Sequence, residues 1–278
     1  MIDISVSDCI KIYFGFAEDP RPVEGWFSPA HLAYVTVMIL ITVGLAILLG
    51  RKYRNSEYKE KRKVLRIATV LILGSEITKI TICCFIAHNF LEILSNLPLF
   101  LCSIHLLALP FAAFGKGRIR DACTDFVFIF GTLGCLAGTY LAGNIFGGSP
   151  VLSFFPMVSV TTHCISGFAG LYSAITGLAS MKAKNRPIVT SILVIFEFLA
   201  AAANFFLNPE NGFGLDYQHN YMFFSSPDGT PFSIVFDMVG GDPTLYGVAV
   251  ALLYIIYLMI FSLIWSLCAK KSVKKQYN

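Results

Sequence analysis

Long apolar runs separated by short polar stretches dominate the hydrophobicity pattern along the chain. A membrane-spanning helix needs about 20 predominantly apolar residues, and runs of about that length recur from residue 29 to residue 268. The predicted helices are residues 29–50, 64–87, 98–114, 123–143, 154–181, 188–207 and 244–268. The third run is short and contains Pro110, which should kink it. The pattern therefore predicts an all-α, polytopic membrane protein with seven transmembrane helices.

The polar flanks divide the chain into three parts. Asp3 and Asp8 stand where a signal peptide would carry basic residues, so residues 1–28 are predicted to form an extramembrane or interfacial segment. Residues 29–268 are predicted to form a single transmembrane domain. Residues 269–278 form a basic tail, which we expect on the cytoplasmic side.

Lysine and arginine alternate strictly between successive loops. The loops after the first, third and fifth predicted helices and the tail are basic, whereas the loops after the second, fourth and sixth helices contain neither residue. Cytoplasmic loops are enriched in Lys and Arg. The alternation predicts seven spans, with the N-terminus outside and the C-terminus inside.

Composition agrees with this class of protein. The chain is 56% hydrophobic and only 14% charged, with a mean hydropathy of +0.69, whereas soluble domains are about 25% charged. A soluble enzyme, a nucleic-acid-binding protein and a disordered chain are thereby excluded. The net charge of +4 is interpreted as the orientation signal plus attraction to anionic headgroups at the cytoplasmic face. The eight cysteines are scattered and do not form a disulfide framework.

Three charged side chains lie deep within predicted helices. Glu76 and Lys79 are three residues apart and can meet on one helix face, and Glu197 lies on the sixth predicted helix. Ionisable groups inside a membrane are costly and often functional. The three side chains could form a proton or ion relay of a transporter. Alternatively, they form an ion-pair core that orients the helices.

A cysteine and two histidines lie in the outer halves of the third and fifth predicted helices. These are Cys102, His105 and His163. A neighbouring imidazole can take the proton of a buried thiol and create a nucleophile. Alternatively, Cys102 is a small core residue and His163 a hydrogen-bonded core histidine. A zinc or iron site is weakly indicated, because the set lacks a carboxylate, and we expect neither metal nor cofactor.

Small residues recur on the fourth and fifth predicted helices. Gly134 and Gly138 form a GxxxG motif, and Gly170, Ala174 and Gly177 lie on related faces of the next helix. Such residues allow helix backbones to approach closely. We therefore predict tight packing between helices at these positions.

Three short motifs resemble a known family. The sequence LPLFLCS at residues 97–103 resembles the LPLHLCS-type motif of the YwaF/TMEM164-like integral membrane proteins. The sequence FSPAHL at residues 27–32 resembles the segment that opens their first helix. Asn220, Tyr221 and Met222, followed by Pro227 and Pro231, resemble the motif before their last helix. The order of the motifs and the distances between them match across most of the chain.

The resemblance implies a seven-helix membrane fold. Animal relatives are regarded as phospholipid acyltransferases with a Cys–His pair, and a more distant group hydrolyses fatty-acid esters with a Thr–His pair. Cys102 falls on the family cysteine, and His163 is the best match for the family histidine. The histidine of the LPLHLC pattern is replaced by Phe100 here, and His105 could supply the lost polarity. Activity is mostly unassigned in bacterial members.

The expected function is acyl transfer to or from a lipid. Cys102 would be the nucleophile that forms an acyl-thioester, and His163 the general base and acid, on a phospholipid or related substrate. The supporting side chains would be His31, His105, Asn204, Asn220 and Tyr221, of which the last three could stabilise an oxyanion. The alternatives are a transporter or ligand-binding membrane protein that uses Glu76, Lys79 and Glu197, or a structural or regulatory protein. For a bacterial source, the cell membrane is the expected location.

Overall fold

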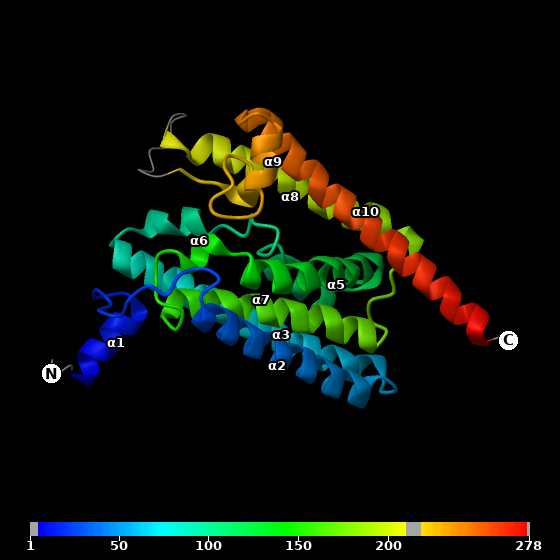
Figure 1. The fold of residues 1–278 in the computed structure, drawn as a ribbon. Coiled ribbons are helices and arrows are strands. Elements are labelled where there is room, and N and C mark those ends of the chain that lie inside the picture. The colour runs from blue at the N-terminus through cyan, green and yellow to red at the C-terminus, as the bar shows by residue number, and fades with distance from the viewer. Residues whose placement is uncertain (1–4, 210–217, 277–278) are drawn as a thin grey trace.

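The computed structural model describes residues 5–209 and 218–276, and every regular element in these ranges is helical (Figure 1). The α-helices are α1 (Val6–Phe14), α2 (Pro29–Tyr53), α3 (Tyr58–Ala87), α4 (His105–Phe114), α5 (Gly117–Tyr140), α6 (Gly143–Phe146), α7 (Phe154–Ile175), α8 (Arg186–Leu207), α9 (Ser233–Met238) and α10 (Pro243–Gln276). Short 3₁₀ segments are η1 (Phe90–Asn96), η2 (Ala183–Asn185) and η4 (Tyr221–Phe223). Within the described ranges, six helical stretches are long and apolar enough to cross a membrane: α2, α3, α5 with α6, α7, η2 with α8, and α10. The chain is thus an all-helical, multi-pass membrane protein.

The helices form a bundle with a second layer across it. Helix α7 packs most closely on α5, and α2 and α3 also pack against α7. Helix α4 fills the space between α3 and α5. Figure 1 shows α8 and α10 crossing one side of this bundle, with α9 beside them and the two chain ends at opposite ends of the molecule. The largest buried core joins both layers and includes Phe126 and Phe130 of α5 and Tyr254 of α10.

The third predicted helix is helical over only part of its length. The sequence predicts one helix over residues 98–114, whereas the structure has turns before the ten-residue α4. Proline disfavours helical backbone at the preceding residue and has no N–H to donate, so Pro98 cannot continue a helix from Leu97, whose backbone is extended (ψ 145°). Non-helical backbone at membrane depth requires a protein environment rather than lipid. Packing of η1 and α4 against α3 provides that environment.

The basic loops gather at one end of the bundle, here called the basic end. Arg62 near the start of α3 donates from Nη2 to the carbonyl oxygens of Ala113 (2.6 Å) and Gly115 (2.9 Å), at the end of α4. Lys61 donates from Nζ to the carbonyl of Thr176 (2.9 Å), at the end of α7. The start of α3 therefore lies beside the ends of α4 and α7.

The opposite end of the bundle is closed by loops and short helices. The indole of Trp26 donates to the carbonyl oxygen of Tyr140 at 2.8 Å, which joins the start of α2 to the end of α5. The amide of Val151 donates to the carboxylate of Glu24 at 2.9 Å. We call this the loop end.

Candidate active site

Cys102 lies in the turn between η1 and α4. The carbonyl oxygen of Phe100 accepts from the amides of Ser103 (2.8 Å) and Ile104 (3.1 Å), which closes the turn. The ring of His105, at the start of α4, donates from Nδ1 to the carbonyl oxygen of Cys102 at 2.8 Å. His105 is fully buried, whereas Cys102 is half-buried. His105 thus holds the backbone of Cys102.

The His163 ring is held by its own helix. Nδ1 donates to the carbonyl oxygen of Ser159, one turn earlier on α7, at 2.7 Å. In a neutral imidazole with the proton on Nδ1, Nε2 carries the lone pair and can accept a proton. The side chains of Cys102 and His163 are electrostatic neighbours, and both lie against the same stretch of α5. The thiol of Cys102 and the imidazole of His163 are therefore neighbours inside the bundle.

Two glycines of α5 make room for this pair. A Cβ at Gly138 would lie 2.2 Å from both Cδ2 and Nε2 of His163. A Cβ at Gly134 would lie 3.6 Å from the Cβ of Cys102 and 4.0 Å from Cδ2 of His163, which are ordinary contacts. The GxxxG motif thus lies under both side chains. Only the second glycine is sterically required by the histidine ring.

The glycines of α7 serve helix packing. A Cβ at Gly167 would lie 2.4 Å from the Cβ of Cys135, and one at Gly170 would lie 2.8 Å from the carbonyl oxygen of Val127. The prediction of close packing through Gly170 is therefore consistent with the geometry. Gly177 lies beyond α7, with φ +74°, and nothing lies within 4 Å of a Cβ built there.

Asn204 and Tyr221 hold the loop before the last helix. The side chain of Asn204 donates to the carbonyl of Tyr221 at 3.0 Å and accepts from its amide at 2.7 Å. The Tyr221 hydroxyl donates to the carbonyl of Leu94 and accepts from the amide of Leu97 at 3.3 Å. These contacts join α8, η4 and η1 above the turn that holds Cys102. We call this set of three elements the cap.

Asn220 is occupied within its own loop. Its amide nitrogen donates to the carbonyl of Ser226 at 2.7 Å and to the carboxylate of Asp228 at 2.6 Å. Its amide oxygen accepts from the amide of Ser225 at 2.8 Å. Asn220 therefore shapes the loop that follows η4, and its donors point to loop acceptors.

His31 joins two helices at the loop end. Its Nδ1 accepts from the amide of Phe27 at 3.2 Å, so Nε2 carries the proton and donates to the carbonyl of Thr139 at 3.0 Å. The ring is fully buried and lies 4.1 Å from the ring of Phe146, centroid to centroid. Both nitrogens of His31 are occupied by backbone partners.

The three charged side chains of the predicted polar core lie in two places. Lys79 and Glu76 form an ion pair on α3. Glu197 is buried on α8, in the layer that crosses the bundle, and within the described chain its Oε1 has no hydrogen-bond partner. Helix α8 packs on α5, α10 and η4 rather than on α3. The structure thus brings together the first two residues and not the third.

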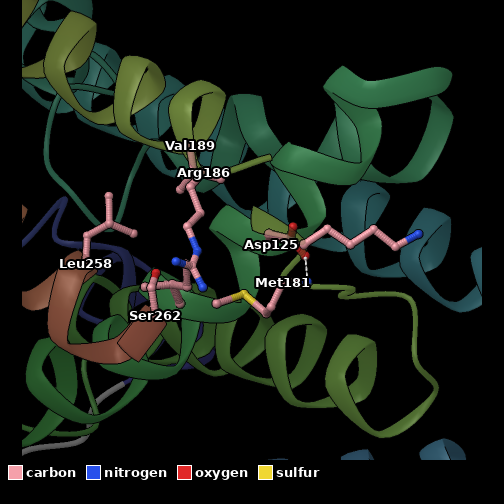
Figure 2. Close-up of a pocket in the computed structure, with 8 residues that line it drawn as sticks. Asp125, Met181, Arg186, Val189, Leu258 and Ser262 are labelled. Atoms are coloured by element: carbon pink, nitrogen blue, oxygen red, sulfur yellow. Dashed lines mark hydrogen bonds between the residues drawn. The ribbon is translucent and has the colours of Figure 1, made fainter. Parts of the chain in front are cut away.

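A second polar cluster, at the basic end, is shown in Figure 2. The carboxylate of Asp125 accepts from the amide of Met181 and from the side chain of Asn185, each at 2.8 Å. The cavity beside it has a volume of about 10 Å³, at the lower limit for one water molecule. Asp125 therefore ties the loop between α7 and α8 to α5.

Some residues of the site could not be found by sequence reasoning. Every residue type has a backbone carbonyl, so the sequence does not single out that of Ser159. Its role as the partner of His163 depends on the rotamer of that histidine. Gly138 was visible as part of GxxxG, but that motif indicates packing in general and not a histidine ring. Among the described residues, no group of three or more His, Cys, Asp or Glu side chains is placed to hold a metal ion.

Comparison with known proteins identifies the class and then the family. The helices and their apolar lengths define a multi-pass membrane protein. The family model of the TMEM164 family matches residues 26–265, which include all three motifs, and the chain belongs to that family. No curated protein and no solved structure matches this sequence.

Proposed function

We propose that the chain crosses the membrane seven times, with the N-terminus outside and the C-terminus inside. The path from α3 to α5 supports the seventh crossing. Residue 88 follows the end of α3, whereas Ala113 lies beside Arg62 at the start of α3, so residues 88–114 return along the whole helix. The turn at Cys102 makes this crossing discontinuous. The basic end would face the cytoplasm.

The proposed activity is acyl transfer from a phospholipid or related lipid, or hydrolysis of its acyl ester. The proximity of the Cys102 thiol and the His163 ring, which lie against the same glycines of α5, is the observation that carries this proposal. Unlike His31, His163 has only its Nδ1 occupied by a backbone partner. A thiol with an adjacent base is the arrangement that nucleophilic catalysis requires.

The reaction would proceed in two steps. Nε2 of His163 takes the thiol proton as Sγ of Cys102 attacks the ester carbonyl, and the tetrahedral intermediate collapses as the ester oxygen leaves with that proton. The products are an alcohol, such as a lysolipid, and an acyl-thioester on Cys102. In the second step His163 takes a proton from water or an acceptor alcohol, which attacks the thioester, and the proton then returns to the thiolate. Water gives a fatty acid, and an alcohol gives a new ester.

Turnover of phospholipid by purified protein in lipid nanodiscs tests this function. Cys102→Ala and His163→Ala should each lower product formation by at least about 100-fold, because general base catalysis alone contributes about 10²–10⁴. Intact-mass spectrometry should detect one acyl adduct on the wild type, localised to Cys102. Products are measured as lysolipid, free fatty acid and newly acylated lipid.

Matched variants separate chemistry from folding. Cys123→Ala removes another buried thiol, on α5 at the basic end, and His88→Ala removes an exposed histidine. Both should retain wild-type turnover, and all four variants should elute as the wild type does in size-exclusion chromatography. Unchanged turnover in well-folded Cys102→Ala and His163→Ala would contradict the proposal.

A further inference from the structure

Three glycines form a row on one face of α5. Gly131, Gly134 and Gly138 are three and four residues apart, so they lie on the same side of the helix. A Cβ built at Gly134 would lie 3.6 Å from the Cβ of Cys102. A Cβ built at Gly138 would overlap the ring of His163. The first glycine extends the row beyond this pair, toward the basic end of α5.

The neighbour of Gly131 is the ring of His105. A Cβ built at this glycine would lie 3.4 Å from Nε2 of the histidine. Nδ1 of the same ring donates to the carbonyl oxygen of Cys102 at 2.8 Å. The order along α5 is therefore His105, Cys102 and His163, with the cysteine between two imidazoles. His105 binds the backbone of the cysteine, whereas His163 neighbours its thiol.

The carbonyl of Cys102 depends on this imidazole. Residues 101–104 form turns rather than helix, so this carbonyl is not part of a helical hydrogen-bond ladder. Within the described ranges, the backbone amides that close the turn donate to Phe100, and none donates to Cys102. A backbone carbonyl at membrane depth must find a donor in the protein. His105 supplies the donor that a continuous helix would have provided.

Packing alone would not favour a histidine at position 105. The side chain is fully buried, and its ring centroid lies 5.7 Å from that of Phe126. Because Nδ1 carries the proton, Nε2 carries a lone pair, which has no hydrogen-bond partner in the described part of the chain. Leucine has a similar size and no polar atom to leave unpaired. The bond from Nδ1 to Cys102 is therefore the contact that distinguishes histidine from leucine here.

We propose that His105 is a positioning residue that holds Cys102 where its thiol lies beside His163. The hydrogen bond to the Cys102 carbonyl fixes the turn over Gly134, and the ring that makes the bond is itself packed against Gly131. In this role His105 moves no proton and acts only through the backbone of Cys102. The role rests on the proposed nucleophilic function of that cysteine.

Two substitutions of His105 separate the hydrogen bond from the packing. Asparagine keeps an N–H near the position of Nδ1, whereas leucine fills the site without a donor. Purified variants in nanodiscs are treated with iodoacetamide at pH 7, and the alkylation rate of Cys102 is measured by mass spectrometry. His105→Leu should slow alkylation about tenfold, because the thiolate forms less readily once the thiol is no longer held beside His163. His105→Asn retains the bond and should stay within about threefold of the wild type.

A purely structural role predicts a different order of the two variants. Leucine leaves no polar atom unpaired, and asparagine leaves part of the site empty, so His105→Leu should unfold at the same temperature as His105→Asn or a higher one. Alkylation that follows this order of stability would contradict the proposal. His31→Leu is the matched control, because it replaces another fully buried histidine, whose hydrogen bonds reach Phe27 and Thr139. It should alkylate within about twofold of the wild type.

A double-mutant cycle tests whether His105 acts through the Cys–His pair. In a His163→Ala protein, His105→Leu should change the alkylation rate less than about twofold, because no imidazole is left for the thiol to lose. A tenfold effect in both backgrounds, or equal rates in His105→Leu and the wild type, would overturn the proposal. Alkylation needs no lipid turnover. A failure of the proposed enzyme function would instead appear as phospholipid turnover that survives Cys102→Ala.

Discussion

The cap and the α5–α7 interface are two polar regions of one bundle that treat their hydrogen-bonding groups differently. In the cap, Asn204 uses its donor and its acceptor on the backbone of Tyr221, and the Tyr221 hydroxyl binds the backbone of η1. At the interface, the backbone binds only Nδ1 of His163, and the ring neighbours the thiol of Cys102. The cap is saturated by backbone partners, and the interface keeps one reactive pair.

This difference teaches that polarity inside a membrane does not by itself indicate chemistry. A buried polar group that satisfies backbone donors and acceptors stabilises a fold, because leaving those groups unpaired costs about 1–3 kcal/mol each. A side chain available for chemistry must instead keep an atom that no backbone group occupies. The same criterion separates His163 from His31.

The glycines beneath the pair provide the sharpest test of the interface. Gly138→Ala would place a Cβ 2.2 Å from the His163 ring, so the ring must leave its position beside α5. A displacement of about 1 Å costs about 100-fold in catalysis, and we expect that loss in lipid turnover. Gly134→Ala makes only ordinary contacts and should lose less than about threefold.

The two substituted positions are four residues apart on α5, so any general effect of an alanine on this helix should be the same in both variants. Thermal unfolding in detergent should be similar for both, since the group displaced at Gly138 is a side chain. Equal turnover in the two variants would show that the position of His163 is not critical, and the interface would then resemble the cap.

A variant of the cap should lower stability more than it lowers intrinsic reactivity. Asn204→Ala removes the side-chain acceptor of the Tyr221 amide and one of the two donors to the Tyr221 carbonyl, which still accepts from the amide of Phe224, with an expected loss of about 2 kcal/mol. Asn96→Ala is the matched control, because it loses one hydrogen bond to the carbonyl of Glu92, at a half-buried position. Unfolding is followed by circular dichroism. The rate at which iodoacetamide alkylates Cys102, measured by mass spectrometry, reports the reactivity of the thiol.

A selective loss of turnover would reverse this interpretation of Asn204. If Asn204→Ala unfolded like the wild type but lost turnover as Cys102→Ala is expected to, Asn204 would belong to the chemistry after all. The sequence prediction of an oxyanion donor at this position would then be restored. The two readouts therefore decide which region Asn204 belongs to.

The sequence predicts the helical class well because the required signal is local. An apolar run of spanning length predicts a helix without reference to the rest of the chain. For example, α8 ends at Leu207, where the predicted helix ends. The failure at residues 98–104 has a physical cause, since an apolar composition is shared by a lipid-facing helix and by a buried turn. Pro98 and the packing of α3 decide between them, and only Pro98 is visible in the sequence.

The candidate site was predictable in its residues but not in its connections. Cys102 and His163 could be named from the motif and from depth, whereas their proximity depends on the turn before α4 and helix α7 both packing on the same glycines of α5. The sequence alone makes equally plausible oxyanion donors of Asn204, Asn220 and Tyr221. Their partners are backbone atoms, which a sequence does not distinguish, so their structural roles could not be predicted.

His31 provides the prediction with the smallest expected change at Cys102, because it is a histidine like His163 but has both ring nitrogens bound by backbone groups, as in the cap. His31→Ala removes the hydrogen bonds with the amide of Phe27 and the carbonyl of Thr139, with an expected loss of about 2 kcal/mol in unfolding free energy. The alkylation rate of Cys102 should stay within about twofold of the wild type, since no hydrogen bond of His31 reaches that residue. His88→Ala, at an exposed position, should change neither quantity. If His31→Ala and His163→Ala slowed alkylation of Cys102 equally, both histidines would serve the thiol, and saturation by the backbone would no longer distinguish the two regions.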